Sequence, residues 1–215
     1  MSHIDLLLNR FLETLSEYGL RQNTVVCFVS DHGEMLGDHH AFRKTLPYEG
    51  SARVPLLLSG PGIPRRKVVS EGVVELRDIL PTLLDAADLP APIGIDGRSA
   101  LPLARGEAVD WRPFLHGEHT AFGQSVHWLT DGRWKYVWWS GTVREQLFDL
   151  TTDPQERHDL HASPETARWR EHMIAALVER EEGFVADGKL ITGRPVRPVL
   201  LSPNYVPSTG GNIGL

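Results

Sequence analysis

The 215-residue sequence has little cysteine, no strongly basic run and no long hydrophobic segment. The single cysteine, Cys27, cannot form an internal disulfide, so the fold does not need an oxidising compartment. No apolar run approaches the roughly 20 residues that span a bilayer, and the first ten residues lack the basic and apolar regions of a signal peptide. As written, the chain is therefore expected to be cytoplasmic, with no membrane partner; an export signal preceding Met1 would change that expectation.

The charge balance is acidic. Lysine and arginine total 22 against 28 aspartates and glutamates, which gives a formal net charge of −6. A protein that binds nucleic acid through its phosphates needs a basic patch, so no nucleic-acid partner is expected. The shares of charged residues (23%) and hydrophobic residues (41%) are those of an ordinary globular protein.

The first 105 residues predict a layered α/β domain. Residues 3–18 place apolar side chains at helical spacing, and 77–89 return to that spacing. Between them, 24–30 and 54–60 are continuous apolar runs, which is typical of strands covered on both faces. The order helix, strand, strand, helix favours a largely parallel sheet.

Residues 106–183 predict a small α+β subdomain. Apolar and aromatic runs flank the Asp-Gly pair at 131–132, a strong hairpin signal, and 145–150 offers a third strand. Ser163 is a suitable N-cap for a long helix that follows it. From residue 184 to 215, proline, glycine and polar residues dominate, so an irregular tail is expected there.

The chemistry-bearing stretch is SDHGEMLGDHHAFRK, residues 30–44. Asp31 and His32 directly follow the first predicted strand, and ligands bind outside the carboxyl ends of strands in open α/β sheets. A carboxylate next to an imidazole suits a divalent cation, although a capping aspartate and a surface histidine are the simpler interpretation. Asp38, two more histidines and Lys44 follow in the same loop, so a metal and an anionic substrate could be held together, with the lysine neutralising negative charge.

These motifs resemble the sulfatases of the alkaline phosphatase superfamily. In that family a strand is followed by Ser-Asp-His/Asn-Gly-Glu, then Leu-Gly-Asp-His and a lysine, and this chain reads SDHGEMLGDHH with Lys44 in place. The resemblance extends over about residues 3–180. It continues in five further motifs: YEGSARVPLL, RDILPTLLD, IDGRSALPL, DGRWKY and LFDLTTDPQERHDL.

The resemblance implies the C-terminal portion of an alkaline-phosphatase-like α/β sandwich with an antiparallel-sheet-and-helix subdomain. The implied activity is hydrolysis of a small-molecule sulfate ester with a divalent cation, calcium first, with manganese or magnesium as alternatives. Asp31 and His32 would be metal ligands and Lys44 would contact the sulfate, while His39 and His40 are weaker candidates for catalytic contacts. Because many arylsulfatases have asparagine where His32 stands, a phosphonate or phosphate ester hydrolase of the same superfamily stays open.

One family feature does not occur in this sequence. Sulfatases use a formylglycine made within a C/S-x-P-x-R motif, and Cys27 lies in CFVSD, without the proline or the arginine. The resemblance places that nucleophile in an N-terminal half, so the chain is expected to be a fragment that is inactive alone. The alternative from another class is a non-catalytic remnant or interaction module.

Two further groups of residues have structural and functional interpretations. Glu118 and His119 could line a cleft, although a structural use is favoured. Alternating tryptophans could stack on a sugar but are more typical of a packing face; they are Trp134, Trp138 and Trp139.

Overall fold

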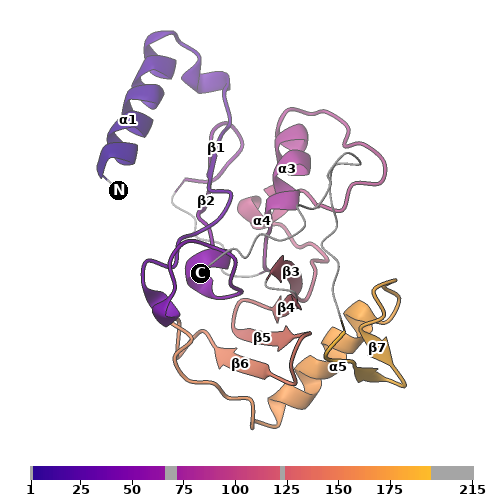
Figure 1. Ribbon diagram of the computed structural model, residues 1–215. Helices are drawn as coiled ribbons and strands as arrows, with labels where there is room; N and C mark the ends of the chain where they lie inside the picture. Colours follow the sequence, from indigo (N-terminus) through magenta and orange to yellow (C-terminus); the bar gives the residue numbers. More distant parts are fainter. Residues whose placement is uncertain (1, 66–71, 122–123, 195–215) are drawn as a thin grey trace, which may run out of the picture.

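The computed structural model describes residues 2–65, 72–121 and 124–194 (Figure 1). The helices are α1 (Ser2–Glu17), α2 (Glu49–Ala52), α3 (Ile79–Ala86), α4 (Leu101–Arg105) and α5 (Glu165–Leu177), with 3-10 turns η1 (Arg21–Asn23), η2 (Asp38–His40) and η3 (Leu76–Asp78). The strands are β1 (Val26–Val29), β2 (Leu56–Ser59), β3 (Leu115–Ala121), β4 (Gln124–Thr130), β5 (Trp134–Trp139), β6 (Glu145–Asp149), β7 (Val185–Ala186) and β8 (Lys189–Leu190). This mixture confirms the α/β class. None of the described helices combines the length and the apolar character needed to cross a membrane.

Helix α1 confirms the helix predicted over 3–18, and the chain leaves it through Gly19 at a φ of +67°. A positive φ suits glycine, which has no Cβ to clash. The apolar stripe of α1 is about half exposed: 53% at Ile4, 48% at Leu7 and 51% at Phe11. Figure 1 shows the helix standing apart from the sheets. The stripe therefore lacks a covering surface among the described residues.

Strands β1 and β2 pair antiparallel, from Val26 opposite Ser59 to Val29 opposite Leu56. The prediction of a largely parallel sheet is therefore wrong for the described strands. These strands are also not covered on both faces, since the β1 residues are only half-buried and Leu57 is 58% exposed. A continuous apolar run indicates a strand that is buried in the complete fold. It does not indicate whether the neighbouring strand is parallel or antiparallel, or which elements cover the strand.

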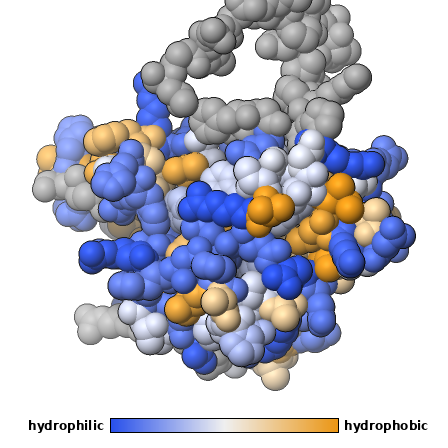
Figure 2. Space-filling model, turned by 60° about the horizontal axis from the view of Figure 1, so that its bottom comes forward, coloured by the Kyte–Doolittle hydropathy of each residue, from blue (hydrophilic) through white to orange (hydrophobic). Residues whose placement is uncertain are grey.

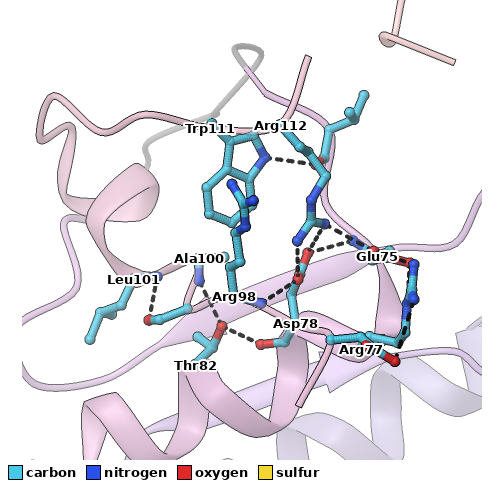
Figure 3. A network of polar contacts seen from close by, with 12 residues as sticks. Glu75, Arg77, Asp78, Thr82, Arg98, Ala100, Leu101, Trp111 and Arg112 are labelled. Carbon is cyan, nitrogen blue, oxygen red and sulfur yellow. Dashed lines mark hydrogen bonds and ion pairs between the residues drawn. The ribbon is translucent and has the colours of Figure 1, made fainter. Parts of the chain in front are cut away.

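Helix α3 is anchored by the carboxylate of Asp78, which lies at its start and is fully buried. Both Asp78 oxygens accept hydrogen bonds of 2.6 Å from the Arg112 guanidinium, and the backbone N–H groups of Glu75 and Arg98 donate to the same carboxylate (Figure 3). The Thr82 hydroxyl donates to the Asp78 carbonyl. This network connects the start of α3 to Arg98 and Arg112, which are 20 and 34 residues further along the chain.

The second sheet has the order β3-β4-β5-β6, and all its pairs are antiparallel. The predicted hairpin at 131–132 is confirmed: it joins β4 to β5, and Gly132 has a φ of +92°. Helix α5 confirms the helix predicted after Ser163, whose hydroxyl accepts a hydrogen bond of 3.3 Å from the Glu165 N–H.

The two faces of this sheet are both packed. One face meets α5 in a cluster of buried side chains: Leu129, Tyr136, Trp138, Leu147, Trp169, Met173, Leu177 and Phe184. The other face meets residues from the first half of the chain: Met35 and Tyr48 pack on Val126, Val137 and Phe148. Trp134, Trp138 and Trp139 all belong to these clusters or pack against them, which confirms their interpretation as packing side chains. The sheet is thus the layer that joins the two parts of the chain.

A buried ion-pair network strengthens that junction. Lys135 on β5 is fully buried, and its Nζ lies 2.9 Å from Glu49 and 3.1 Å from Glu156. The Glu49 N–H also donates to the Glu156 carboxylate. Burial raises the pKa of Glu156, while the nearby Lys135 acts in the opposite direction. Because Glu49 opens α2, this network holds α2 against the sheet.

The tail predicted as irregular from residue 184 differs in its described part. Phe184 is buried, and β7 pairs with β8 in a short hairpin. Residues 195–215 of that predicted tail lie outside the described residues. The domain boundaries at 105 and 183 stay predictions.

The surface carries scattered apolar side chains. On the face shown in Figure 2, hydrophobic groups lie between hydrophilic ones and do not form a single band. Large hydrophobic residues that are more than half exposed include Leu36, Phe42, Leu57, Ile93 and Val143. Most of these belong to the first half of the chain.

Candidate active site

One cleft of about 960 Å³ is lined by both halves of the chain. Its walls come from the loop after β1, the residues around α2, the segment 72–79, strand β3 and the β4–β5 turn. Asp31, His32 and Lys44, which the sequence singles out as metal ligands and sulfate contact, all line it. The structure thus brings the three main candidates to one cavity.

Asp31 and His32 are close enough to share a cation. His32 Nε2 lies 3.5 Å from Asp31 Oδ2, and the Asp31 side chain is 84% exposed. The other Asp31 oxygen accepts a hydrogen bond from the His32 backbone N–H, which orients the carboxylate. Among the described residues, no third histidine, cysteine or carboxylate donor joins this pair. The pair by itself therefore offers two ligands.

The His32 ring is oriented by the backbone. Its Nδ1 lies 2.8 Å from the Gly33 carbonyl oxygen, so Nδ1 carries the hydrogen and Nε2 keeps its lone pair. Such a contact to a carbonyl commonly orients a metal-bound histidine. Gly33 itself is required by close packing, because a Cβ there would lie 2.1 Å from the Gly50 carbonyl oxygen. Each residue of the Asp-His-Gly motif therefore has a distinct role in the local geometry.

Lys44 lies on a loop that is held together by hydrogen bonds within the loop. The Met35 N–H donates to the Arg43 carbonyl over 2.8 Å, and the Glu34 carboxylate accepts from the Arg43 N–H. Lys44 lines the cleft, and within the described residues no carboxylate forms an ion pair with it. Five non-glycine residues of this loop have φ between 50° and 95°: Leu36, His39, His40, Arg43 and Thr45. Strained backbone of this kind concentrates at functional sites.

His39 and His40 lie outside the cleft lining. His39 stacks on Tyr48 with ring centroids 3.9 Å apart, and its Nε2 lies 3.2 Å from the Gln155 carbonyl. His40 is exposed. The geometry gives His39 a packing role and does not favour either histidine as a substrate contact.

Strand β3 supplies a further wall of the cleft, which includes Glu118 and His119 as the sequence allowed. Glu118 also pairs with Arg180 at 2.5 Å, so the structural use that was favoured is present as well. Sequence reasoning missed that His116 and His127 gather beside Glu118. Burial lowers the pKa of His127 to about 3 and also lowers the pKa of His116, so both rings are neutral near neutral pH.

Comparisons with known proteins agree with the motifs. Residues 1–89 match the family model described as Sulfatase. An arylsulfatase of Clostridium perfringens is 43% identical over 203 residues, which are 91% of this chain and 42% of that protein. Among solved structures, a 2-O GAG sulfatase superposes with a TM-score of 0.70 at 28% identity, covering 78% of this chain and 38% of that one. The phosphonate monoester hydrolase of Agrobacterium radiobacter superposes with a TM-score of 0.68 at 29% identity, covering 82% and 38%. The chain therefore spans less than half the length of the proteins it matches.

Proposed function

Because this chain is a member of the sulfatase family, we propose that the protein it represents hydrolyses small-molecule sulfuric esters with a divalent cation. The observation that carries the proposal is the convergence of Asp31, His32 and Lys44 on one cleft. The similarity to an arylsulfatase over nine-tenths of the chain supports the same activity.

In this proposal Asp31 and His32 hold the cation through a carboxylate oxygen and Nε2. The Nδ1 contact with Gly33 keeps Nε2 available, which supports the assignment. The cation would polarise the ester group and offset negative charge that develops on its oxygens. Calcium normally takes six to eight oxygen ligands. Two side chains are therefore only part of the set, and the isolated chain should bind calcium weakly.

Lys44 is proposed to contact the sulfate and the bridging oxygen. Lys44 lines the same cleft as Asp31, and it has no carboxylate partner among the described residues. A fixed positive charge at this place stabilises charge that moves onto the leaving oxygen. The positive φ angles of the surrounding loop support a functional role for the position of Lys44, because strained backbone concentrates at functional sites.

The 215 residues contain no C/S-x-P-x-R motif, and covalent catalysis needs its nucleophile. We therefore expect no turnover of an aryl sulfate by residues 1–215 alone. Turnover by the purified chain that is lost in Lys44→Ala would contradict this expectation.

A second candidate is hydrolysis of phosphonate or phosphate monoesters. It is favoured by the structural similarity to a phosphonate monoester hydrolase and by the histidine at position 32. Aryl sulfate and aryl phosphonate esters should be compared side by side on the full-length protein. The ester with the higher kcat/KM identifies the substrate class, and turnover of neither supports the non-catalytic alternative.

The residue assignments have their own test. In the full-length protein, Lys44→Ala should lower kcat by about 10²–10³-fold, the usual loss when one charge-stabilising group is removed. Arg43→Ala is the matched control, because it removes the adjacent exposed cation, which does not line the cleft. Equal losses in both variants would contradict the role of Lys44.

The ion can be identified through the two proposed ligands. Asp31→Ala should lower the affinity for all divalent cations, as measured by calorimetric titration. His32→Asn should shift the preference from manganese towards calcium, since imidazole suits transition metals and an amide oxygen suits hard cations. An unchanged affinity in Asp31→Ala would show that the metal site lies elsewhere.

A further inference from the structure

A second group of metal-ligating side chains lies on the α5-facing side of the sheet, and it does not include the proposed sulfatase ligands. His116 and Glu118 are two residues apart on β3, so their side chains lie on the same face of the strand. Glu118 is the direct register partner of His127 on β4. One ligand atom from each of these three residues lies within 4.8 Å of the others. The closest pair is His116 Nε2 and His127 Nδ1 at 3.1 Å, and His127 Nδ1 lies 3.5 Å from a Glu118 oxygen.

His127 is fixed in the orientation that a metal ligand requires. Its ring is fully buried and contacts the rings of Trp138 and Phe184. Its Nε2 lies 2.9 Å from the Ser125 hydroxyl. With the hydrogen on Nε2 and donated to Ser125, the Nδ1 lone pair is directed at His116 and Glu118.

The surrounding charge favours a cation. Glu118 pairs with Arg180 at 2.5 Å, and Arg180 also pairs with Glu182 at 2.5 Å. One guanidinium and two carboxylates sum to a charge of −1, and the two imidazoles add none when they are neutral. Arg180 donates to both Glu118 oxygens, and Oε2, the oxygen that lies 3.5 Å from His127 Nδ1, accepts from Arg180 Nη1 at 2.5 Å. A carboxylate has about four acceptor positions, so Glu118 can bind a cation through a second position while it stays paired with Arg180.

From this geometry we infer that His116, Glu118 and His127 form a transition-metal site whose preferred ion is Zn²⁺. Two imidazoles and one carboxylate form a ligand set that zinc binds, and they leave the fourth tetrahedral position for water or an oxygen of a ligand. The set is too poor in oxygen for calcium. Access from solvent is provided by Glu118, whose side chain is 45% exposed, and by the cleft that β3 lines.

A metal-free explanation of the 3.1 Å contact also exists: His116 Nε2–H can donate to His127 Nδ1. The two explanations differ in what Glu118 does. In a hydrogen-bonded histidine pair, Glu118 only binds Arg180. In a zinc site Glu118 is a metal ligand, so removing its negative charge lowers the affinity for zinc.

The test is a titration of the chelator-treated chain with Zn²⁺. It is carried out in the Asp31→Ala background, so that the other proposed metal site does not contribute. We expect one Zn²⁺ per chain, and His116→Gln and Glu118→Gln should each weaken it by more than about a hundredfold, beyond the loss typical of an outer-shell change. The matched control is His119→Gln, the next position on β3, whose side chain lies on the opposite face of the strand and outside the cluster.

Folding is monitored by circular dichroism, and only variants with the parental spectrum are compared. His116→Gln and Glu118→Gln carry the test because they are less buried than His127, whose replacement can unfold the sheet. Replacing zinc with Co²⁺ gives a second readout, since the visible absorption of cobalt reports a tetrahedral nitrogen-and-oxygen site. Absence of stoichiometric binding, or binding that survives in His116→Gln, would overturn the inference in favour of the hydrogen-bonded pair. Neither result depends on sulfatase activity.

Discussion

The two halves of the described chain differ in how much core they possess. Of the described hydrophobic residues that are buried, eleven lie between Val126 and Phe184, and only Met35, Tyr48, Ala100 and Leu101 lie before residue 115. The later half packs α5 on a four-stranded sheet, whereas the earlier half has a two-stranded sheet and helix α1, whose apolar stripe is half exposed. The proposed catalytic residues belong to the half with less core. Their positions therefore depend on contacts with the other half more than on packing of their own.

The largest effect is expected at the buried junction between the halves. Lys135→Met leaves the buried carboxylate of Glu156 without its cation, and breaking a buried ion pair in this way costs about 3–5 kcal/mol of unfolding free energy. Urea denaturation followed by circular dichroism measures it. The control is Arg53→Met, which removes an exposed cation from the same Glu49 and should cost no more than about 1 kcal/mol. Similar losses of unfolding free energy in both variants would show that the unpaired Glu156 carboxylate does not destabilise the junction.

A leucine in each half gives the next comparison. Leu129 is fully buried in the α5 cluster, so Leu129→Ala should cost about 2–5 kcal/mol. Leu57 on β2 is 58% exposed, and Leu57→Ala should change the unfolding free energy by less than about 0.5 kcal/mol. Denaturant midpoints at constant slope report both. A large loss at Leu57 would mean that the earlier half has a tighter core than its exposure indicates.

The smallest expected effect depends on pH. Burial alone would raise the pKa of the Asp78 carboxyl, but the hydrogen bonds from Arg112 and from the backbone outweigh it and lower the pKa. A depressed pKa stabilises the fold above the unfolded-state value of about 4, and this stability is lost as the pH falls through the folded-state pKa. The difference in unfolding free energy between the parent and Asp78→Asn should therefore shrink from about pH 7 to about pH 3. A difference that does not change with pH would contradict the ionised pair with Arg112.

Local patterns were sufficient for most elements of the fold. Helical spacing located α1 and α3, the N-cap signal at Ser163 located α5, and the Asp-Gly pair located the β4–β5 hairpin, because these signals act over a few residues. The direction in which β2 pairs with β1 was not predictable, since an apolar run is the same in either direction.

The candidate site divides in the same way. Asp31, His32 and Lys44 are close in sequence and belong to a recognisable motif, so their common cleft could be anticipated. His116 and His127 meet only through the β3–β4 register, and one residue of slip would place them on opposite faces. No local pattern carries that information.

The loop that presents Lys44 has a consequence for recombining related enzymes. His39 of this loop stacks on Tyr48, and the Tyr48 hydroxyl donates to Gln146 on β6. A crossover between residues 106 and 114 would take Tyr48 from one parent and Gln146 from the other. Chimeras made at this apparently natural junction inherit a mismatched support for the loop unless both ends of the contact come from one parent. The useful unit of exchange is therefore a set of contacts and not a continuous stretch of chain.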